Sequence, residues 1–319
     1  MSVGKKFNKM VHCTDIGSKE LIIPQAKIGI EVEVENWRPH RMPAGWVTHD
    51  DGSLRGGKEF VTDGGMVGKG AVEAVRQICG FCVASGFSAG YPRAGIHIHV
   101  DMTDMNDGSD TQLLNAVSAY LLFEDALFSF AGQWRRACGF CDPLLLSQAG
   151  RPALARFLVD WQVPTANPLR GLDKYAALNL LPLATYGTVE FRALPTTFDP
   201  ERIINWINLC LAFKKFGKDI DKNPVELLDT LGVDGLTSAI FLDWYPVIRP
   251  HIDTMAVHRA AGQVCGLSAG LPLSIKTLKR IAPSWDPPTN PLLLKKIELA
   301  ERKKGLVQPE RHLDLLPEV

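Results

Sequence analysis

The sequence predicts an α+β fold, in which a twisted, mainly antiparallel sheet curls into a partial barrel with helices on its outer face and a helical C-terminal extension. Three short segments alternate apolar and polar residues, as half-buried strands do, at residues 27–35, 95–101 and 188–192. Longer segments carry apolar residues at helical spacing, at residues 70–84, 110–131 and 200–218. From residue 224 onward the sequence is typical of helices.

Length and composition exclude several classes of protein. At 319 residues the chain can form one large domain or two modest ones. Its 35 basic and 35 acidic residues balance, so no field of one sign would hold nucleic acid or an anionic membrane. No run reaches the roughly 18 uncharged apolar residues of a membrane span, and the N-terminus lacks a signal-peptide core. Seven cysteines fit reduced thiols better than a disulfide framework. We expect a cytoplasmic protein without a nucleic-acid or membrane partner.

The chain divides into three predicted parts. Residues 1–25 have little periodicity and are expected to form a leader or a small hairpin, while residues 221–319 form a helical extension that can pack on the same domain. Between them, residues 26–220 form the domain with the charged strands. Within it we expect a loop rich in turn residues at 36–51 and a short strand at 58–62.

The first strand carries three carboxylates on one face. Because successive side chains on a strand point to opposite faces, Glu31, Glu33 and Glu35 share one face and the apolar residues share the other. Three carboxylates on one face repel unless they meet bulk water or a cation. This strand alone is compatible with either.

The same design recurs in two distant segments. His97, His99 and Asp101 share one face of the second strand, and Glu190 and Arg192 share one face of the third. Gly95 permits close backbone approach, and Asp101 is placed to fix a histidine tautomer. If the three strands are neighbours in one sheet, their charged faces form a common floor for an active site.

Each of these groups also has a structural explanation. The glutamates can be a solvated strand face, the histidines can be satisfied structural residues, and Glu190 with Arg192 can be a surface ion pair of little energetic weight. The functional interpretation gives Glu190 to a metal and Arg192 to a transferring phosphoryl group. Three charged strand faces together favour the functional interpretation, whereas Glu59, a single carboxylate in a short strand, fits both.

Two identical Cys-Gly-Phe-Cys segments add four thiols, at Cys79, Cys82, Cys138 and Cys141. They could form a four-thiolate zinc site or a redox pair. Because Cys79 and Cys82 fall on the apolar stripe of a predicted helix, where thiols pack as small hydrophobic groups, zinc is the less favoured interpretation.

The strand motifs resemble the catalytic strands of the glutamine synthetase and glutamate-cysteine ligase superfamily, most closely those of its amidoligase family of carboxylate-amine ligases. That family has a Glu-x-Glu strand, an Asp-Gly-Ser turn with a Glu strand, a His-x-His strand, an Arg before the next loop and a Thr-x-Glu-Phe-Arg strand. This chain carries the same order in Glu31 and Glu33, Asp51-Gly-Ser, Glu59, His97 and His99, Arg135 and Arg136, and Thr188-Val-Glu190-Phe-Arg192. The similarity covers about residues 28–215 and implies a glutamine-synthetase-like form of the predicted sheet.

The resemblance implies ATP and two Mg²⁺ ions, with Mn²⁺ as an alternative. Glu31, His97 and Glu190 would hold the nucleotide-side ion. Glu33 and Glu59 would hold the substrate-side ion, whose third carboxylate is open between Asp51 and Asp63. Arg192 would neutralise the γ-phosphate and His99 would contact the nucleotide. The candidate substrate contacts are Arg93, Arg135, Arg136 and Tyr175.

The function that the resemblance implies is an ATP-dependent carboxylate-amine ligase that forms an amide through an acyl phosphate from small-molecule or peptide substrates. Two other classes are compatible with the same motifs. One is a phosphotransferase of guanidine-kinase type on a similar sheet, and the other is a non-catalytic binding or structural protein that retains the fold.

Overall fold

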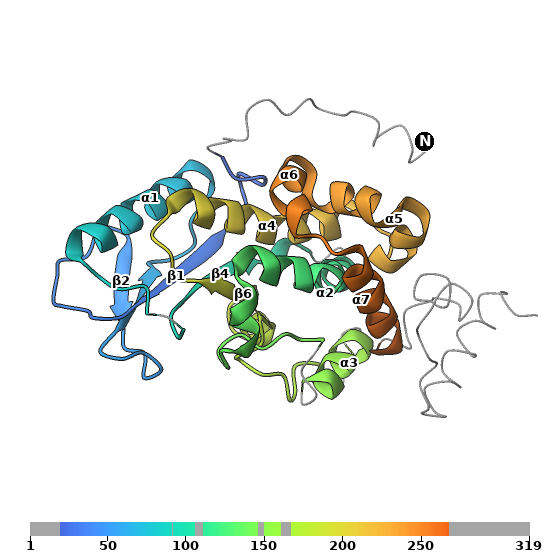
Figure 1. Ribbon diagram of the computed structural model, residues 1–319, viewed down its shortest axis with the longest axis horizontal. Helices are drawn as coiled ribbons and strands as arrows, with labels where there is room; N and C mark the ends of the chain where they lie inside the picture. Colours follow the sequence, from blue (N-terminus) through green and yellow to red (C-terminus); the bar gives the residue numbers. More distant parts are fainter. Residues whose placement is uncertain (1–19, 91, 106–110, 146–149, 161–166, 268–319) are drawn as a thin grey trace, which may run out of the picture.

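The computed structural model describes residues 20–90, 92–105, 111–145, 150–160 and 167–267. The strands are β1 Ile28–Val34, β2 Trp46–His49, β3 Lys58–Thr62, β4 Gly95–Asp101, β5 Leu178–Asn179 and β6 Thr188–Pro195. The helices are α1 Gly68–Ser85, α2 Thr111–Ala131, α3 Arg151–Asp160, α4 Pro200–Asp219, α5 Pro224–Phe241, α6 Tyr245–Ile248 and α7 Thr254–Leu267, and a 3₁₀ helix, η3, covers Gln133–Ala137. The predicted α+β class is confirmed (Figure 1).

The sheet places the three charged strands side by side. Its order is β2-β3-β1-β4-β6-β5, and each pair of neighbours is antiparallel. β1, β4 and β6 are therefore neighbours at the centre of the sheet. Among the described residues the sheet is open, with β2 and β5 at its edges, and forms no closed barrel. The curling into a partial barrel stays a prediction.

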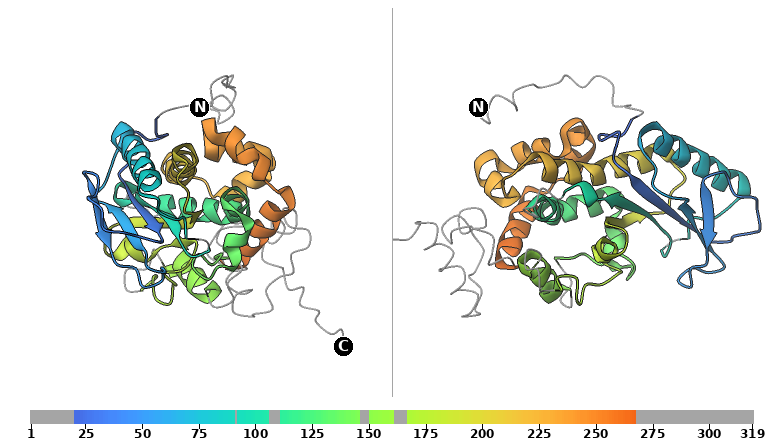
Figure 2. Two further views of the ribbon diagram at one scale, coloured as in Figure 1. Left: turned by 60° about the vertical axis from the view of Figure 1, so that its left-hand side comes forward. Right: turned by 180° about the vertical axis from the view of Figure 1, so that it is seen from behind.

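One face of this sheet is the apolar face that the alternation predicts. Ile28, Ile30, Val32 and Val34 are all buried, as are the isoleucines of β4. Figures 1 and 2 show α1 and α4 side by side over the sheet, and the two helices contact each other. Asp199 caps α4, since its Oδ1 accepts hydrogen bonds from the backbone N–H groups of Glu201 and Arg202. The charged side chains are left to the opposite face of the sheet.

Helix α2 lies in the interior of the protein. By length and composition it is the one helix of the described ranges that could cross a membrane, but 78% of its most apolar window is buried inside the protein. It packs against α4 and α7, and α5 packs against α4, so the helices after residue 220 share the same apolar core. The helical character predicted from residue 224 is confirmed as far as residue 267. The boundary at residue 220 stays a prediction.

Glu124 is a buried acid of α2. Its carboxylate accepts hydrogen bonds from the backbone N–H groups of Leu144 at 2.8 Å and Leu145 at 3.2 Å. Burial outweighs these bonds and raises the pKa of Glu124 from 4.5 to about 7. A pKa raised by folding gives stability that is complete below pH 4.5 and is lost as the pH rises through 7.

We therefore expect Glu124→Gln to remove about 3 kcal/mol of pH dependence from the free energy of unfolding between pH 4.5 and 7. Urea titrations at several pH values measure this. The exposed Glu73→Gln on α1 is the control and should keep the wild-type pH dependence. If the free energy of unfolding depends on pH in the same way for wild type and Glu124→Gln, the expectation is contradicted.

The two edge strands differ from the predictions. Residues 46–49, predicted as part of a loop, form β2, in which only Trp46 is buried, so no alternation is visible. β5 has two residues and was not predicted. Of the predicted leader, residues 20–25 form turns and no strand, and residues 1–19 lie outside the described ranges, as do residues 268–319 of the predicted extension.

Candidate metal and nucleotide site

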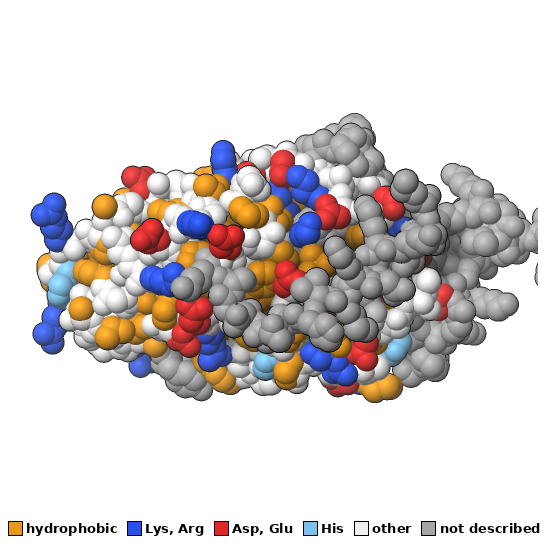
Figure 3. Space-filling model, turned by 90° about the horizontal axis from the view of Figure 1, so that it is seen from above, with side chains coloured by type: hydrophobic (Ala, Val, Ile, Leu, Met, Phe, Trp, Pro, Cys, Tyr) orange, Lys and Arg blue, Asp and Glu red, His pale blue; other side chains and the backbone are white. Residues whose placement is uncertain are grey.

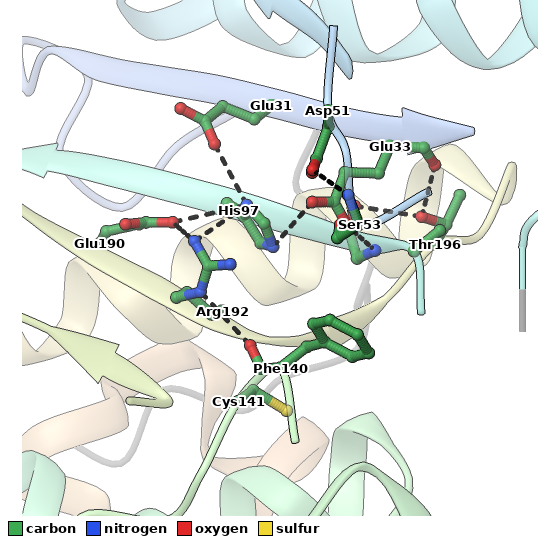
Figure 4. Close-up of polar contacts among 12 residues, drawn as sticks. Glu31, Glu33, Asp51, Ser53, His97, Phe140, Cys141, Glu190, Arg192 and Thr196 are labelled. Carbon is green, nitrogen blue, oxygen red and sulfur yellow. Dashed lines mark hydrogen bonds and ion pairs between the residues drawn. The ribbon is translucent and has the colours of Figure 1, made fainter. Parts of the chain in front are cut away.

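Strand register brings the predicted ligands together on the charged face of the sheet. Glu31 pairs with His97 across β1 and β4, and His99 pairs with Glu190 across β4 and β6. On the other side of β1, Glu33 pairs with Glu59 of β3. Directly opposed residues have Cβ atoms about 5 Å apart. The six carboxyl and imidazole positions thus form one continuous cluster, of which Figure 4 shows Glu31, Glu33, His97 and Glu190.

A first ligand group lies across the three central strands. It consists of Glu31, His99 and Glu190, whose ligand atoms lie within 4.8 Å of one another. His99 Nε2 lies 3.1 Å from Glu31 Oε1, and His99 Nδ1 lies 3.0 Å from Thr188 Oγ1. Asp101 does not fix this imidazole as predicted, because its Oδ1 accepts hydrogen bonds from the backbone N–H and the hydroxyl of Thr103.

His97 lies between the carboxylates of β1 and β6. Its Nδ1 lies 3.1 Å from Glu31 Oε2 and 3.4 Å from Glu190 Oε1, and its Nε2 lies 3.8 Å from Glu33 Oε1. Its side chain is only 2% exposed. A second ligand group within 4.8 Å contains Glu31, Glu59 and His97. His97 therefore contacts Glu31 and Glu190 through Nδ1 and approaches Glu33 through Nε2. His99 belongs to the first ligand group, with Glu31 and Glu190.

The third ligand group is entirely acidic. It consists of Glu33, Asp51 and Glu59, again within 4.8 Å. Glu33 Oε2 accepts a hydrogen bond from the backbone N–H of Gly95 at 2.5 Å, and Asp51 Oδ1 accepts one from that of Ser53 at 2.7 Å. Of the two residues left open for the third carboxylate, the structure places Asp51 in this group, and Asp63 belongs to none of the three groups.

The cluster places several carboxylates close together in a largely buried environment. Burial, together with the charges of Glu31, Glu33 and Asp51, raises the pKa of Glu59 to about 9. Burial also raises the pKa of Glu33. The pKa of Glu31 lies well below its usual range, because hydrogen bonds and charge from His97 and His99 outweigh its burial. Carboxylates that repel one another in this way fit a divalent cation, and oxygen ligands are those that Mg²⁺ prefers.

Arg192 is the cation beside this cluster. Its Nη1 contacts the Glu190 carboxylate and lies 3.4 Å from His97 Nδ1, and its Nε donates to the Phe140 carbonyl at 3.4 Å. The charges of Glu190 and Glu33 outweigh burial and raise the pKa of Arg192. The side chain is 13% exposed, so the planar guanidinium is held in place and still reaches solvent.

A β-bulge positions Arg192, and Arg135 supports the bulge. The register shift between Ile96 and Ile98 sets Arg192 and Ala193 against the single residue His97. The fully buried Arg135 guanidinium donates to the carbonyls of Pro92, Ala94, Arg192 and Ala193, at 3.1 to 3.5 Å. Arg135, predicted as a substrate contact, is therefore committed to backbone atoms. Gly95 is required here, because an added Cβ would lie 2.8 Å from Arg135 Nη2 and 2.9 Å from His97 Nε2.

We expect Arg135→Met to lower the free energy of unfolding by about 3 kcal/mol or more, because buried carbonyls lose their donors. Arg136→Met is the matched control. Arg136 pairs with Asp125 in a partly exposed contact, whose loss should cost less than about 1 kcal/mol. Urea unfolding followed by tryptophan fluorescence measures both variants. Equal losses of stability would show that Arg135 does not support the bulge.

The other predicted substrate contacts lie in different places. Arg93 Nη1 donates to the Ser53 carbonyl at 2.7 Å, next to the turn that carries Asp51. The Tyr175 ring packs edge-on against Phe140, with ring centroids 6.1 Å apart. These two residues border the cluster, and their substrate role stays a prediction. Arg136 instead contacts Asp125 and the Phe128 ring on α2, and its substrate role also stays a prediction.

Sequence reasoning missed three groups that contact residues of the site. Asn179 Nδ2 donates to Glu190 Oε2 at 2.7 Å. Thr196 Oγ1 donates to the Glu33 backbone carbonyl at 2.7 Å, and the Phe140 carbonyl accepts from Arg192. The sequence could have indicated Asn179, since it is the only polar residue of 176–183. It cannot indicate a backbone carbonyl such as that of Phe140, because every residue has one.

The four thiols of the Cys-Gly-Phe-Cys segments do not form one group. Cys79 and Cys82 are buried on α1, and burial raises the pKa of each to about 12. Cys138 and Cys141 lie in the loop after η3, with their Sγ atoms 3.6 Å apart. Within the described ranges, none of the groups of three or more potential metal ligands contains a cysteine.

One surface cavity lies away from the cluster. It has a volume of about 930 Å³ beside α1, and Lys69, Val72 and Arg76 are among its lining residues, which include no ligand of the cluster. In the view from above (Figure 3), acidic, basic and hydrophobic side chains of the described ranges are interspersed, without an extended area of one charge. The convergence of chemically reactive groups, not cavity size, therefore identifies the candidate site.

The fold and the site define an α+β protein with carboxylates, imidazoles and one arginine gathered on one face of an antiparallel sheet. Comparison with known families matches residues 72–214 to the family model described as "Putative amidoligase enzyme", which confirms the resemblance to the amidoligase family. The match covers somewhat less than half of the chain and includes β4 and β6, but not β1 or β3. It indicates an enzyme with a ligase-type function. Neither curated proteins nor solved structures gave a match.

Proposed function

We propose that the protein is an ATP-dependent carboxylate-amine ligase that forms an amide through an acyl-phosphate intermediate. The observation that carries the proposal is the convergence of the first and third ligand groups on one sheet face, with Arg192 beside them. The amidoligase family match supports a ligase-type reaction. On this proposal the open antiparallel sheet is the glutamine-synthetase-like sheet that the resemblance implies.

The ligand groups fit two divalent cations. Glu33, Asp51 and Glu59 offer only oxygen atoms and would hold Mg²⁺ on the substrate side. Glu31 and Glu190, with His99 or His97, would hold the nucleotide-side ion, where an imidazole also suits Mn²⁺. When bound, the cations would supply positive charge against the phosphate oxygens of ATP. The like-charge repulsion that raises the pKa of Glu59 supports this assignment.

The proposed reaction solves a problem of leaving groups. An amine cannot displace oxide from a carboxylate, so the acid carboxylate first attacks the γ-phosphorus of ATP and ADP leaves. The amine then attacks the acyl carbon, inorganic phosphate leaves, and a base takes the amine proton. Arg192, oriented by Glu190 and the Phe140 carbonyl, donates to the oxygens of the transferring phosphoryl group. His99, at the more exposed end of the cluster, contacts the nucleotide.

The test is a product analysis with ATP, Mg²⁺ and mixtures of small-molecule or peptide acids and amines. We expect ADP release that depends on the amine, with one amide formed for each ADP. A phosphorylated product without an amide would instead indicate a phosphotransferase. If no mixture releases ADP and Glu31→Gln binds nucleotide as the wild type does, the proposal is wrong.

A further inference from the structure

The two Cys-Gly-Phe-Cys segments have the same sequence but different surroundings. The first lies inside helix α1, where Cys79 and Cys82 are both buried in the apolar core. The second follows η3, with Cys138 partly exposed and Cys141 fully buried. Gly139 adopts a left-handed backbone conformation with φ of 72°, so this segment is a turn and not a helix. The chain thus contains two thiol motifs of identical sequence that differ in backbone conformation and in exposure.

The second segment has the asymmetry of a reactive thiol pair. The Sγ atoms of Cys138 and Cys141 lie 3.6 Å apart. The hydrogen bond with Cys141 and the charge of Arg135 lower the pKa of Cys138 to about 6, whereas the same hydrogen bond and burial raise the pKa of Cys141. An accessible thiolate beside a buried thiol is the arrangement in which one sulfur attacks and the other resolves.

This segment also touches the arginine of the candidate site. The carbonyl of Phe140, between the two cysteines, accepts the hydrogen bond from Arg192 Nε at 3.4 Å (Figure 4). Cys141 Sγ also lies 3.2 Å from the carbonyl of Arg135, so its one thiol proton is shared between this carbonyl and Cys138 Sγ. A disulfide requires sulfur atoms about 2.05 Å apart, roughly 1.5 Å closer than here, and removes the thiol proton that makes this second bond. Disulfide formation therefore moves at least one of the two sulfur atoms and breaks the bond to the Arg135 carbonyl.

We propose that Cys138 and Cys141 are a redox-active dithiol that a low-molecular-weight disulfide oxidises, and that the disulfide so formed shifts the Phe140 carbonyl and with it the Arg192 guanidinium. The Cys138 thiolate attacks one sulfur of the oxidant, which forms a mixed disulfide and releases one thiolate. The Cys141 thiol then attacks Cys138 Sγ, and its proton passes to the second departing thiolate. Two protein thiols are oxidised and one external disulfide is reduced to two thiols.

Thiol mapping tests the chemistry independently of any ligase activity. The folded protein is equilibrated in buffers of reduced and oxidised glutathione, alkylated, and analysed by peptide mass spectrometry. We expect an internal Cys138–Cys141 disulfide, with Cys79 and Cys82 alkylated only after unfolding. Cys141→Ser should stop at a mixed disulfide of Cys138 with glutathione, and Cys138→Ser should form neither product. Oxidation of the Cys79 and Cys82 pair as readily as the second pair, or no disulfide at 138 and 141, would overturn the proposal.

A first kinetic check uses iodoacetamide at pH 7. Because a thiol with a pKa of about 6 is mostly thiolate at this pH, Cys138 should react about ten-fold faster or more than an ordinary exposed cysteine. Cys79 and Cys82 provide the internal comparison and should stay unreacted in the folded protein. A Cys138 rate no higher than theirs would contradict the proposed reactivity.

The coupling to Arg192 is tested by hydrogen exchange of the reduced and oxidised protein. We expect peptides that cover β6 to exchange about ten-fold faster after oxidation, since the amide of Arg192 donates to the carbonyl of Ala177, whose own amide donates to the carbonyl of Asp142 beside the turn. Peptides of β1 should stay unchanged. Unchanged exchange in β6 would overturn the coupling. Regulation of the ligase rests on the proposed function and is read separately, as a loss of Mg·ATP affinity on oxidation that Cys138→Ser prevents. If ATP does not bind in either state, the proposed function fails while the thiol chemistry stands.

Discussion

Replacing Arg192 with Lys is expected to lower the rate of ATP-dependent amide formation by about 10³-fold. Arg192 uses Nη1 and Nε to contact Glu190 and the Phe140 carbonyl, and the planar fork then faces a transferring phosphoryl group with fixed donors. Lys keeps the charge but offers one compact ammonium, which cannot make both contacts and still orient donors. Rates of ADP release with the acid and amine found in the product analysis measure the effect.

A matched control separates this effect from a general loss of basic charge. Arg76 forms an exposed ion pair with Glu201 on the helical side of the molecule, and Arg76→Lys should keep the wild-type rate. The Arg192→Lys protein should also bind Mn²⁺ as the wild type does, because Arg192 is not a ligand. A normal rate in Arg192→Lys would remove the guanidinium from the proposed mechanism.

Glu31→Gln is expected to weaken divalent-cation binding by about 10²-fold or more. Glu31 belongs to two of the three ligand groups and contacts both His97 and His99. Even outer partners of metal ligands are worth about 10- to 100-fold in affinity, so removal of a charged ligand should cost at least as much. Titration with Mn²⁺, followed by calorimetry, measures the affinity of wild type and variant.

Glu35→Gln provides the control for this variant. Glu35 comes directly after β1, and the alternation places it on the same face as Glu31 and Glu33, but it belongs to none of the ligand groups. Its carboxylate instead accepts a hydrogen bond from the backbone N–H of Arg55. Cation affinity should be unchanged in Glu35→Gln. Equal affinities for Glu31→Gln and wild type would mean that the cluster does not hold the cation.

The central strands could be predicted because alternation is strongest where one face is apolar and the other charged. β3 and β4 have the predicted bounds, and β1 differs by one residue at each end. β6 continues three residues beyond the predicted end at Arg192, because the bulge at Arg192 and Ala193 breaks the two-residue period. The edge strands β2 and β5 are too short, at four and two residues, to show a period at all.

The candidate site was predicted in its residue types but not in its details. Alternation shows which side chains share a face, but only the register shows that His99 lies opposite Glu190 and that Glu33 lies opposite Glu59. Asp51 reaches the acidic group from a turn, and a turn carries no period from which its direction follows. The same limit applies to Arg135, whose burial among carbonyls depends on a bulge that the sequence does not reveal.

The most direct measurement is an anomalous difference map from crystals grown with Mn²⁺ and a non-hydrolysable ATP analogue. We expect two peaks on the charged face of the sheet. One should contact Glu33, Asp51 and Glu59, and the other should contact Glu31, Glu190 and one of the two histidines, with the γ-phosphate of the analogue near Arg192. An empty acidic cluster beside a bound analogue, or manganese bound only elsewhere on the protein, would contradict the proposed function.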